Sequence, residues 1–219
     1  MMIRSTAHRT RPSRGFTLIE LMIALVLGLL MIGATVTVFI SNQQTSRVKT
    51  ELGNAQEAFR FASQTIMRVV QQGSEIRDPE GEGLLRVEVT PGDGKVDCLG
   101  RSVDGVYKVF NTFSINNAGE LLCHVVAVDI DDNPTGPGDT VVLVEGLDAG
   151  PGRSEFTFGV ADVVDGYWKN NTLWGEAGDV DEWHNVRSVR VRLAKQVGGE
   201  AIGATAVFSA TMRCAVLGC

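Results

Sequence analysis

The spacing of Gly15 and Glu20 at the start of an apolar run is the most distinctive chemical feature of this sequence. Leu21–Ile40 contains no charged residue, and about 20 apolar residues are enough to cross a bilayer as a helix. Glu20 lies at the edge of this run, where a carboxylate in hydrocarbon is costly without a partner. A cut after Gly15 would make Phe16 the N-terminus, with its amine one helical turn from Glu20. That amine, or the amine of a neighbouring helix displaced along the axis, is the predicted partner. A helix N-terminus also favours a negative charge.

The same stretch resembles the class III signal of type IV pilins and of the pseudopilins of type II secretion, on the run Arg14-Gly15-Phe16-Thr17-Leu18-Ile19-Glu20-Leu21. In that family a prepilin peptidase cuts after the glycine and methylates the new N-terminal residue. The resemblance therefore implies that Gly15 is the recognition residue, Phe16 the methylated residue and Glu20 the assembly glutamate. An ordinary signal anchor is the alternative, but a secretory signal is cut after a shorter apolar region, at a small-residue site. Major pilins often have a helix-bending proline in this segment, and this chain has none.

Length and charge divide the chain into an anchor and one exported domain. The 219 residues have a formal net charge of -6. The leader, residues 1–15, holds four arginines and no acid, so its removal leaves 16 basic and 26 acidic side chains, a net charge of -10. Nucleic-acid binding would require a basic face, so we expect none. The basic leader before an apolar span predicts a cytoplasmic N-terminus. The four cysteines fit an oxidising compartment outside the inner membrane.

A single long helix is expected over residues 16–72. Its first part, residues 16–40, is the predicted membrane span. Residues 41–72 continue it as an amphipathic helix, because apolar residues recur there at steps of three and four: Val48, Leu52, Ala55, Phe59, Ala62, Ile66 and Val69. Gly73 is a suitable stop signal. Two helices with a break near Ser41-Asn42 are the alternative.

The remaining residues, 73–219, are predicted to form a β-rich head. Residues 73–83 are rich in Gly, Asp, Glu and Pro and are expected to be a connection. Seven later segments are rich in Val, Leu and Phe and are bounded by turn residues: Leu84–Val89, Val106–Phe110, Leu121–Ile130, Thr140–Glu145, Glu155–Val163, Val186–Ala194 and Ala204–Met212. The predicted fold class is α+β, with one long N-terminal helix packed on an antiparallel sheet. Pilins have this architecture too.

A narrower resemblance is to PilW-type minor pilins. It rests on the order of short motifs downstream: Cys98-Leu99-Gly100, Asn111-Thr112-Phe113, Leu121-Leu122-Cys123, Leu143-Val144-Glu145-Gly146, Phe156-Thr157-Phe158-Gly159-Val160 and the segment from Trp183 to Val191. This resemblance implies a minor pilin that primes pilus assembly at the tip and supports twitching motility, adhesion or DNA uptake. Its implied partners are prepilin peptidase, other minor pilins, the major pilin and the inner-membrane assembly platform. A type II secretion pseudopilin with a large β domain is the main alternative.

The resemblance also implies where the chain resides. The protein would be inserted once in the inner membrane, with its N-terminus in the cytoplasm and its head in the periplasm. From there it would be incorporated in the pilus.

Four cysteines allow three pairings. We expect Cys98–Cys123, closing one loop between neighbouring strands, and Cys214–Cys219, closing a short C-terminal loop. One long bridge from the C-terminus to the sheet is the alternative. No CxxC pair or histidine cluster accompanies Cys98 and Cys123, so a metal site at these cysteines is not expected.

Other polar residues offer weaker candidates. Two acidic loops, around Asp129 and Asp131 and around Asp179 and Asp181, are possible irregular calcium sites, with solvated loop acids as the alternative. The first loop is not an EF-hand, because its glycine position holds a proline. His124 is expected to be structural, and Trp183 to pack in the core. No hydrolase, zinc-protease or P-loop motif appears. We therefore expect that the protein is not an enzyme and binds no cofactor. After the minor pilin and the pseudopilin, a membrane-anchored periplasmic enzyme is the third hypothesis for its function.

Overall fold

A computed structural model provides the structure of the chain. It describes residues 15–79, 84–150, 152–160, 162–164, 167–169, 174–175, 180, 183–197 and 200–213. The chain divides into two compact units, Met1–Arg47 and Val48–Cys219.

One α-helix, α1, runs without interruption over Leu18–Gln72. The expected single helix is therefore confirmed, and the alternative break near Ser41-Asn42 is wrong. The helix starts two residues later than expected, because Thr17 precedes it as a cap. Val69 and Val70 are its last fully buried residues, and Gly73 follows its end, as predicted.

Among the described residues of the first unit, the apolar side chains of the helix are exposed. The large apolar residues of α1 from Leu18 to Ile40 are between 50% and 80% exposed. This stretch lies in the one helix, among the described residues, that is long and apolar enough to cross a membrane. Its hydroxyls are satisfied within the helix: Thr35 donates to the Ile32 carbonyl at 2.9 Å, and Thr37 donates to the Gly33 carbonyl at 3.0 Å. Internal bonding of this kind suits a helix in lipid.

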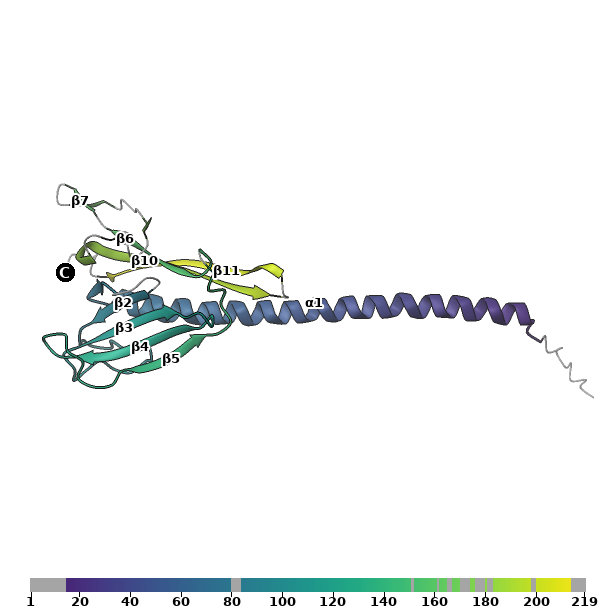
Figure 1. Cartoon of the computed structure of the whole chain (residues 1–219), viewed down its shortest axis with the longest axis horizontal. Coiled ribbons are helices and arrows are strands. Elements are labelled where there is room, and N and C mark those ends of the chain that lie inside the picture. Colours follow the sequence, from purple (N-terminus) through teal and green to yellow (C-terminus); the bar gives the residue numbers. More distant parts are fainter. Residues whose placement is uncertain are drawn as a thin grey trace, which may run out of the picture. The chain divides into compact units, whose positions relative to one another are not determined.

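In the second unit, the first sheet is an antiparallel meander of five strands in sequence order. The strands are β1 (Glu75–Arg77), β2 (Leu84–Val89), β3 (Lys108–Ile115), β4 (Leu121–Val128) and β5 (Asp139–Val144). Figure 1 shows β2 to β5 side by side.

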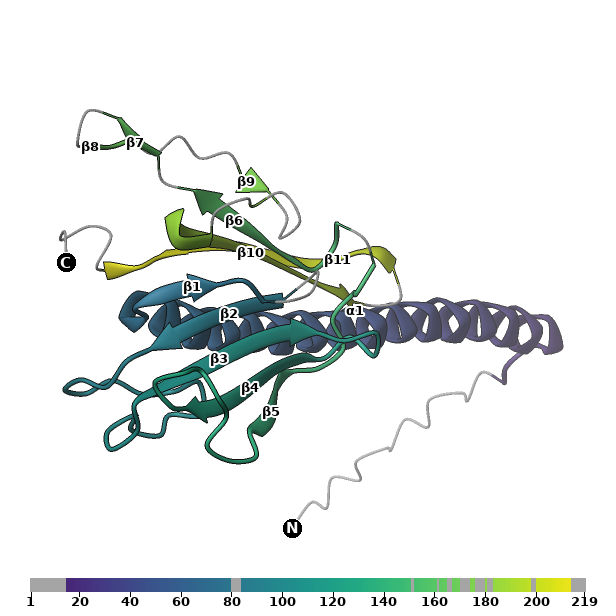
Figure 2. The same ribbon diagram turned by 60° about the vertical axis from the view of Figure 1, so that its left-hand side comes forward.

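The second sheet has the order β11-β10-β6-β9. Its strands are β6 (Glu155–Val160), β9 (Trp174–Gly175), β10 (Val186–Val197) and β11 (Glu200–Thr211). A short 3-10 helix, η2 (Trp183–Asn185), precedes β10. A separate two-stranded ribbon pairs β7 (Asp162–Val164) with β8 (Tyr167–Lys169). Figure 2 shows β10 and β11 as a long hairpin, with β6 beside β10.

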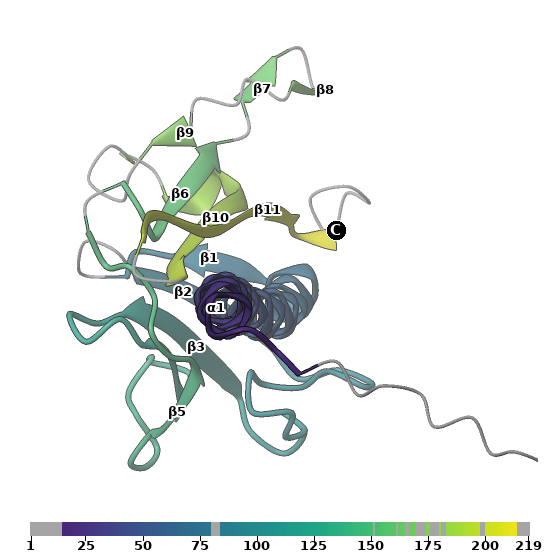
Figure 3. The same cartoon turned by 90° about the vertical axis from the view of Figure 1, so that its right-hand side faces the viewer.

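The core of the second unit joins the second half of α1 to both sheets. The helix contributes the part of the predicted stripe from Ala55 to Val69, with Ile66 fully buried. The first two residues of that stripe, Val48 and Leu52, are 43% and 38% exposed, so the prediction was wrong for them. The first sheet contributes residues such as Phe113, and the second sheet residues such as Val191, both fully buried. Figure 3 shows β1 to β3 around this part of the helix, with β10 and β11 beyond β1. The α+β fold predicted from the sequence is confirmed.

Several strand boundaries differ from the prediction. Residues 75–77, expected in a connection, form β1, which pairs with β2 through Ile76↔Val87. β3 begins later and ends later than expected. β10 and β11 extend through a polar stretch to the pairing Val197↔Glu200, because the ladder hydrogen bonds of a hairpin do not require apolar side chains. Trp183 does pack as predicted: it lies partly buried against the core, with its ring 4.9 Å edge-on from that of Phe158.

Candidate functional site

The predicted cleavage point, Gly15 and Phe16, lies just before α1. A Cβ atom added at Gly15 would meet no heavy atom within 4 Å. The side chain of Phe16 is 81% exposed. Nothing among the described residues therefore covers this peptide bond. Glycine at this position is not required by packing, so a requirement for it would come from the enzyme that recognises it.

Glu20 lies in the first turn of α1. Thr17 Oγ1 accepts a hydrogen bond from the Glu20 backbone N–H at 3.4 Å and donates to Glu20 Oε2 at 3.5 Å. This is the geometry of a helix N-cap, in which a hydroxyl satisfies one of the unpaired N–H groups of the first turn. The sequence spacing Thr-x-x-Glu is that of a capping box. Sequence reasoning recognised Glu20 but missed Thr17, although this spacing was the signal for it.

The cap explains how the chain positions the acid before any partner arrives. Glu20 is exposed, and its long bond to Thr17 leaves most of its acceptor capacity available. A carboxylate at a helix N-terminus is stabilised by the unpaired N–H groups there. The site can thus accept a cationic group close to residue 16, which is where a new N-terminal amine would form.

The Cys98–Cys123 disulfide is present, as predicted. Cys98 lies in the loop between β2 and β3, and Cys123 lies in β4. The bridge therefore ties a loop to a strand and does not join two neighbouring strands, which corrects the expected geometry. It encloses a sequence separation of 25 residues.

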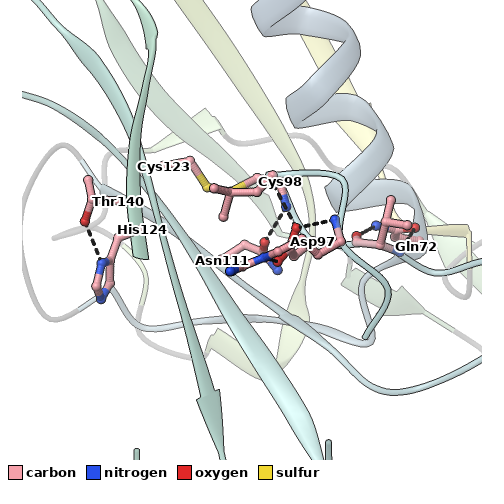
Figure 4. Close-up of a disulfide and its surroundings, with 10 residues drawn as sticks. Gln72, Asp97, Cys98, Asn111, Cys123, His124 and Thr140 are labelled. Atoms are coloured by element: carbon pink, nitrogen blue, oxygen red, sulfur yellow. Dashed lines mark hydrogen bonds and ion pairs between the residues drawn. A yellow bond between two sulfur atoms is a disulfide. The ribbon is translucent and has the colours of Figure 1, made fainter. Parts of the chain in front are cut away.

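Polar side chains hold the disulfide loop in place (Figure 4). Asn111 is fully buried and accepts a bond from the Cys98 N–H at 2.8 Å. Asp97 accepts bonds from the backbone N–H groups of Leu99 and Arg101, both at 2.9 Å. Gln72, at the end of α1, bonds to both backbone groups of Val96. The end of the helix, the disulfide and the sheet are therefore fastened at one point, which no sequence motif predicted.

His124 lies in the middle of β4, with its ring Nδ1 2.9 Å from Thr140 Oγ1 on β5 (Figure 4). This cross-strand contact agrees with the structural role predicted for the residue.

The loop around Asp129 is organised by hydrogen bonds. Asp129 Oδ1 accepts the backbone N–H groups of Asp131 and Asn133, each at 2.9 Å. The bond from Asn133, with those from its neighbours, lowers the pKa of Asp129 below its ordinary value. Asp132 adopts a left-handed backbone (φ 62°) and forms an ion pair with Lys108 on β3. These contacts give the loop acids partners in the protein. Calcium binding at Asp129 and Asp131 stays a prediction, which calorimetric titration tests.

Lys108 also belongs to an unpredicted group of charges on the outer face of the first sheet. It is 7% exposed, and its Nζ lies 3.6 Å from Glu88, which is 6% exposed and bound by Arg77 at 2.8 Å. The bond to Asp132 raises the pKa of Lys108. Two nearly buried charges are therefore paired, as burial requires.

Other predicted site residues lie outside the described residues. These are Cys214 and Cys219, with their proposed bridge, and Asp179 and Asp181 of the second acidic loop. Among the residues that the structure does describe, no three His, Cys, Asp or Glu side chains are grouped as metal ligands.

Comparison with known proteins gives one match, at the N-terminus. The family described as the prokaryotic N-terminal methylation motif matches residues 10–36. No curated protein and no solved structure matches the chain. The matched segment contains the exposed Gly15–Phe16 bond, the capped Glu20 and the start of the apolar helix. The match supports a type IV pilin-like or pseudopilin-like protein, processed by prepilin peptidase and held in the inner membrane by one helix.

Proposed function

We propose that this protein is a minor type IV pilin of the PilW type, which takes part in priming pilus assembly at the pilus tip. The observation that carries the proposal is the prepilin-type motif at residues 10–36, joined through one continuous helix to a large β-rich head. The head has two main sheets, of five and four strands. The priming role at the tip follows from the resemblance of the downstream motifs to PilW-type minor pilins.

In the proposed mechanism, prepilin peptidase cuts after Gly15 and methylates Phe16. The helix stays in the inner membrane, with the leader side in the cytoplasm and the head in the periplasm. Glu20 then pairs with the N-terminal amine of a neighbouring subunit. An unpaired carboxylate is costly in hydrocarbon, so the pairing favours stacked helices over single ones. The assembly platform would receive this protein with other minor pilins, ahead of the major pilin.

The proposed role is structural. It includes no catalysis, no cofactor and no direct contact with nucleic acid. Twitching motility, adhesion and DNA uptake would depend on the protein through the pili it initiates.

The test is a strain that lacks this chain, compared with the same strain after the gene is restored. Surface pili are counted by electron microscopy, and secreted proteins are assayed in the medium. Loss of pili with normal secretion is expected. Normal pili with exoproteins retained in the periplasm would overturn the proposal and favour the alternative, a pseudopilin of a type II secretion system, which shares the same N-terminal segment.

A further inference from the structure

A cavity of about 330 Å³ lies beside the β10–β11 hairpin, remote in sequence from the N-terminal motif. A volume of this size is at the lower end of the range for small-molecule sites. Its lining residues are Asp148, Gly152, Arg153, Arg192, Ala194, Lys195, Gln196, Gly203, Thr205 and Val207.

The segment after β5 builds one wall of the cavity by extending the second sheet. Leu147 forms a bridge to Lys195, and the Asp148 N–H donates to the Ala194 carbonyl at 2.7 Å. Ser154 Oγ accepts the Ala194 N–H at 3.0 Å. The β10–β11 pairing has a register shift between Lys195 and Val197, and such bulges re-aim side chains locally. The cavity is open to solvent: Val207 is 54% exposed and the Arg192 side chain 47% exposed.

Cationic side chains exceed acidic ones in this lining. Asp148 is the one carboxylate, and it already accepts bonds from Arg153 at 2.8 Å, from the Gly150 N–H at 3.1 Å and from Gln196 at 3.4 Å. The Gly150 bond and the others lower the pKa of Asp148, so it stays ionised and occupied. Lys195 Nζ donates to a neutral acceptor, the Glu145 carbonyl, at 2.8 Å. With Glu155 beside Arg192 counted, three cationic side chains face two carboxylates, a local surplus of one positive charge.

Arg192 is the best placed of these cations to bind a ligand. Its Nη1 donates to the Gly152 carbonyl at 3.0 Å, and the same atom lies 3.7 Å from Glu155 Oε1. These contacts fix the guanidinium through one nitrogen. A guanidinium carries five N–H donors in a planar fork, so the contacts described leave donors for a second oxyanion. Its side chain is 47% exposed, so solvent reaches it.

We propose that this cavity binds an oxyanion group, a phosphate or a carboxylate, carried on a polar body of about the size of a sugar. Arg192 binds the anion, with Arg153 and Lys195 adding positive charge. Bidentate binding of carboxylates and phosphates is the characteristic chemistry of arginine. Thr205 supplies a hydroxyl, and Ala194 and Val207 supply apolar surface for the body of the ligand.

The experiment uses the full chain in an uncharged detergent and isothermal titration with three probes. Glucose 6-phosphate carries a phosphate, glucuronate carries a carboxylate, and glucose is the uncharged reference. We expect saturable binding of at least one anion and none of glucose, and weaker binding as salt increases. Binding of the phosphate alone or of the carboxylate alone identifies the group. Equal binding of glucose, or no saturable binding of either anion, would overturn the proposal.

Substitutions test the residue assignment. Arg192→Gln is expected to weaken binding by about tenfold, since a charge-assisted hydrogen bond is lost. Arg190→Gln is the matched control, because Arg190 lies two residues earlier on the same strand and outside the lining. The affinity of this variant for the anion should stay within about twofold of that of the unchanged chain. Arg192→Lys keeps the charge and the fold but loses the fork, so it should fall between the two. Unchanged affinity in Arg192→Gln, or an equal loss in Arg190→Gln, would contradict the assignment.

Discussion

The two halves of α1 use apolar residues in opposite ways. Between Leu18 and Ile40 these residues are half or more exposed all round the helix. Between Ala55 and Val70 most of them form one stripe that is buried against the sheets of the same chain, although Phe61 is 53% exposed. One helix therefore carries an apolar segment that is exposed among the described residues and a second apolar segment that packs against strands of the same chain.

The difference separates two kinds of sequence requirement. A segment that meets lipid or other helices needs general hydrophobicity and a few specific groups, here Gly15, Phe16 and Glu20. A segment packed in a core needs a particular residue at each position, because protein interiors are close-packed. Substitutions in the first half should thus affect processing and assembly, and those in the second half should affect folding.

Replacing Gly15 by valine should give the largest effect, nearly complete loss of processing, because the side chain would crowd the peptidase. The space around Gly15 is open in this chain, so folding should be unchanged. Removal of the leader is measured by the gel mobility of the chain from cells that contain prepilin peptidase. Gly28→Ala is the control: it also has open space and lies within the span. Processing of Gly15→Val at the rate of the control would contradict the assignment.

Glu20→Ala should leave cleavage intact and reduce incorporation into filaments by about tenfold or more, because a charge-assisted bond to the neighbouring amine is lost. The measurement is the ratio of the chain in sheared filaments to the chain in membranes. Because the proposed tip position has no subunit above it, the loss should be smaller than the loss caused by replacing the corresponding glutamate of a filament subunit. Normal incorporation and normal pilus number together would count against an assembly role for Glu20.

A matched pair of isoleucines tests the two halves directly. Ile66 is fully buried and Ile23 is 54% exposed. Ile66→Ala should lower the free energy of unfolding of the second unit by about 2–5 kcal/mol, while Ile23→Ala should leave it unchanged. Urea denaturation in detergent, followed by tryptophan fluorescence, measures both. Equal effects of the two substitutions would break the distinction between the halves.

Removing the disulfide by changing Cys98 and Cys123 to alanine should destabilise the second unit by about 2–4 kcal/mol, because a 25-residue loop is no longer closed in the unfolded chain. Cleavage at Gly15 should proceed normally. The same denaturation experiment measures the loss, and mass spectrometry of the leader measures cleavage. A defect in cleavage equal to that of Gly15→Val would show that the two regions are not separate.

The smallest effect concerns the loop at Asp129. Its folded pKa is lowered from an ordinary value of 3.8, so the charged form stabilises the folded loop. This stability is fully present above the ordinary pKa and is lost as pH falls through the lower folded value. The amide NMR signals of Asp131 and Asn133 should therefore titrate with a midpoint below 3.8. A midpoint at or above that value would contradict the hydrogen bonds described.

The sequence was most informative where a local pattern dictates structure. The apolar run predicted the first half of α1, and the stripe at steps of three and four predicted the second. The pairing of Cys98 with Cys123 was also predicted. The helix cap at Thr17 was not predicted, although the Thr-x-x-Glu spacing to Glu20 is a local signal for it.

Features that depend on contacts between residues far apart in the sequence were not predicted. β1 has only three residues, and it forms because β2 offers a free edge. The fastening of Gln72 to Val96 and the pairing of Glu88 with Lys108 join segments far apart in the chain. The cavity at Arg192 needs both the segment after β5 and the bulge in β10. Such contacts are set by the register of the sheets, which no short pattern specifies.

The most direct test of this account is the mass of the N-terminal peptide of the protein isolated from membranes of its own cells. The account predicts a chain that begins at Phe16 with a methyl group on its amine. A chain that retains residues 1–15, or one that begins elsewhere without the methyl group, would contradict it.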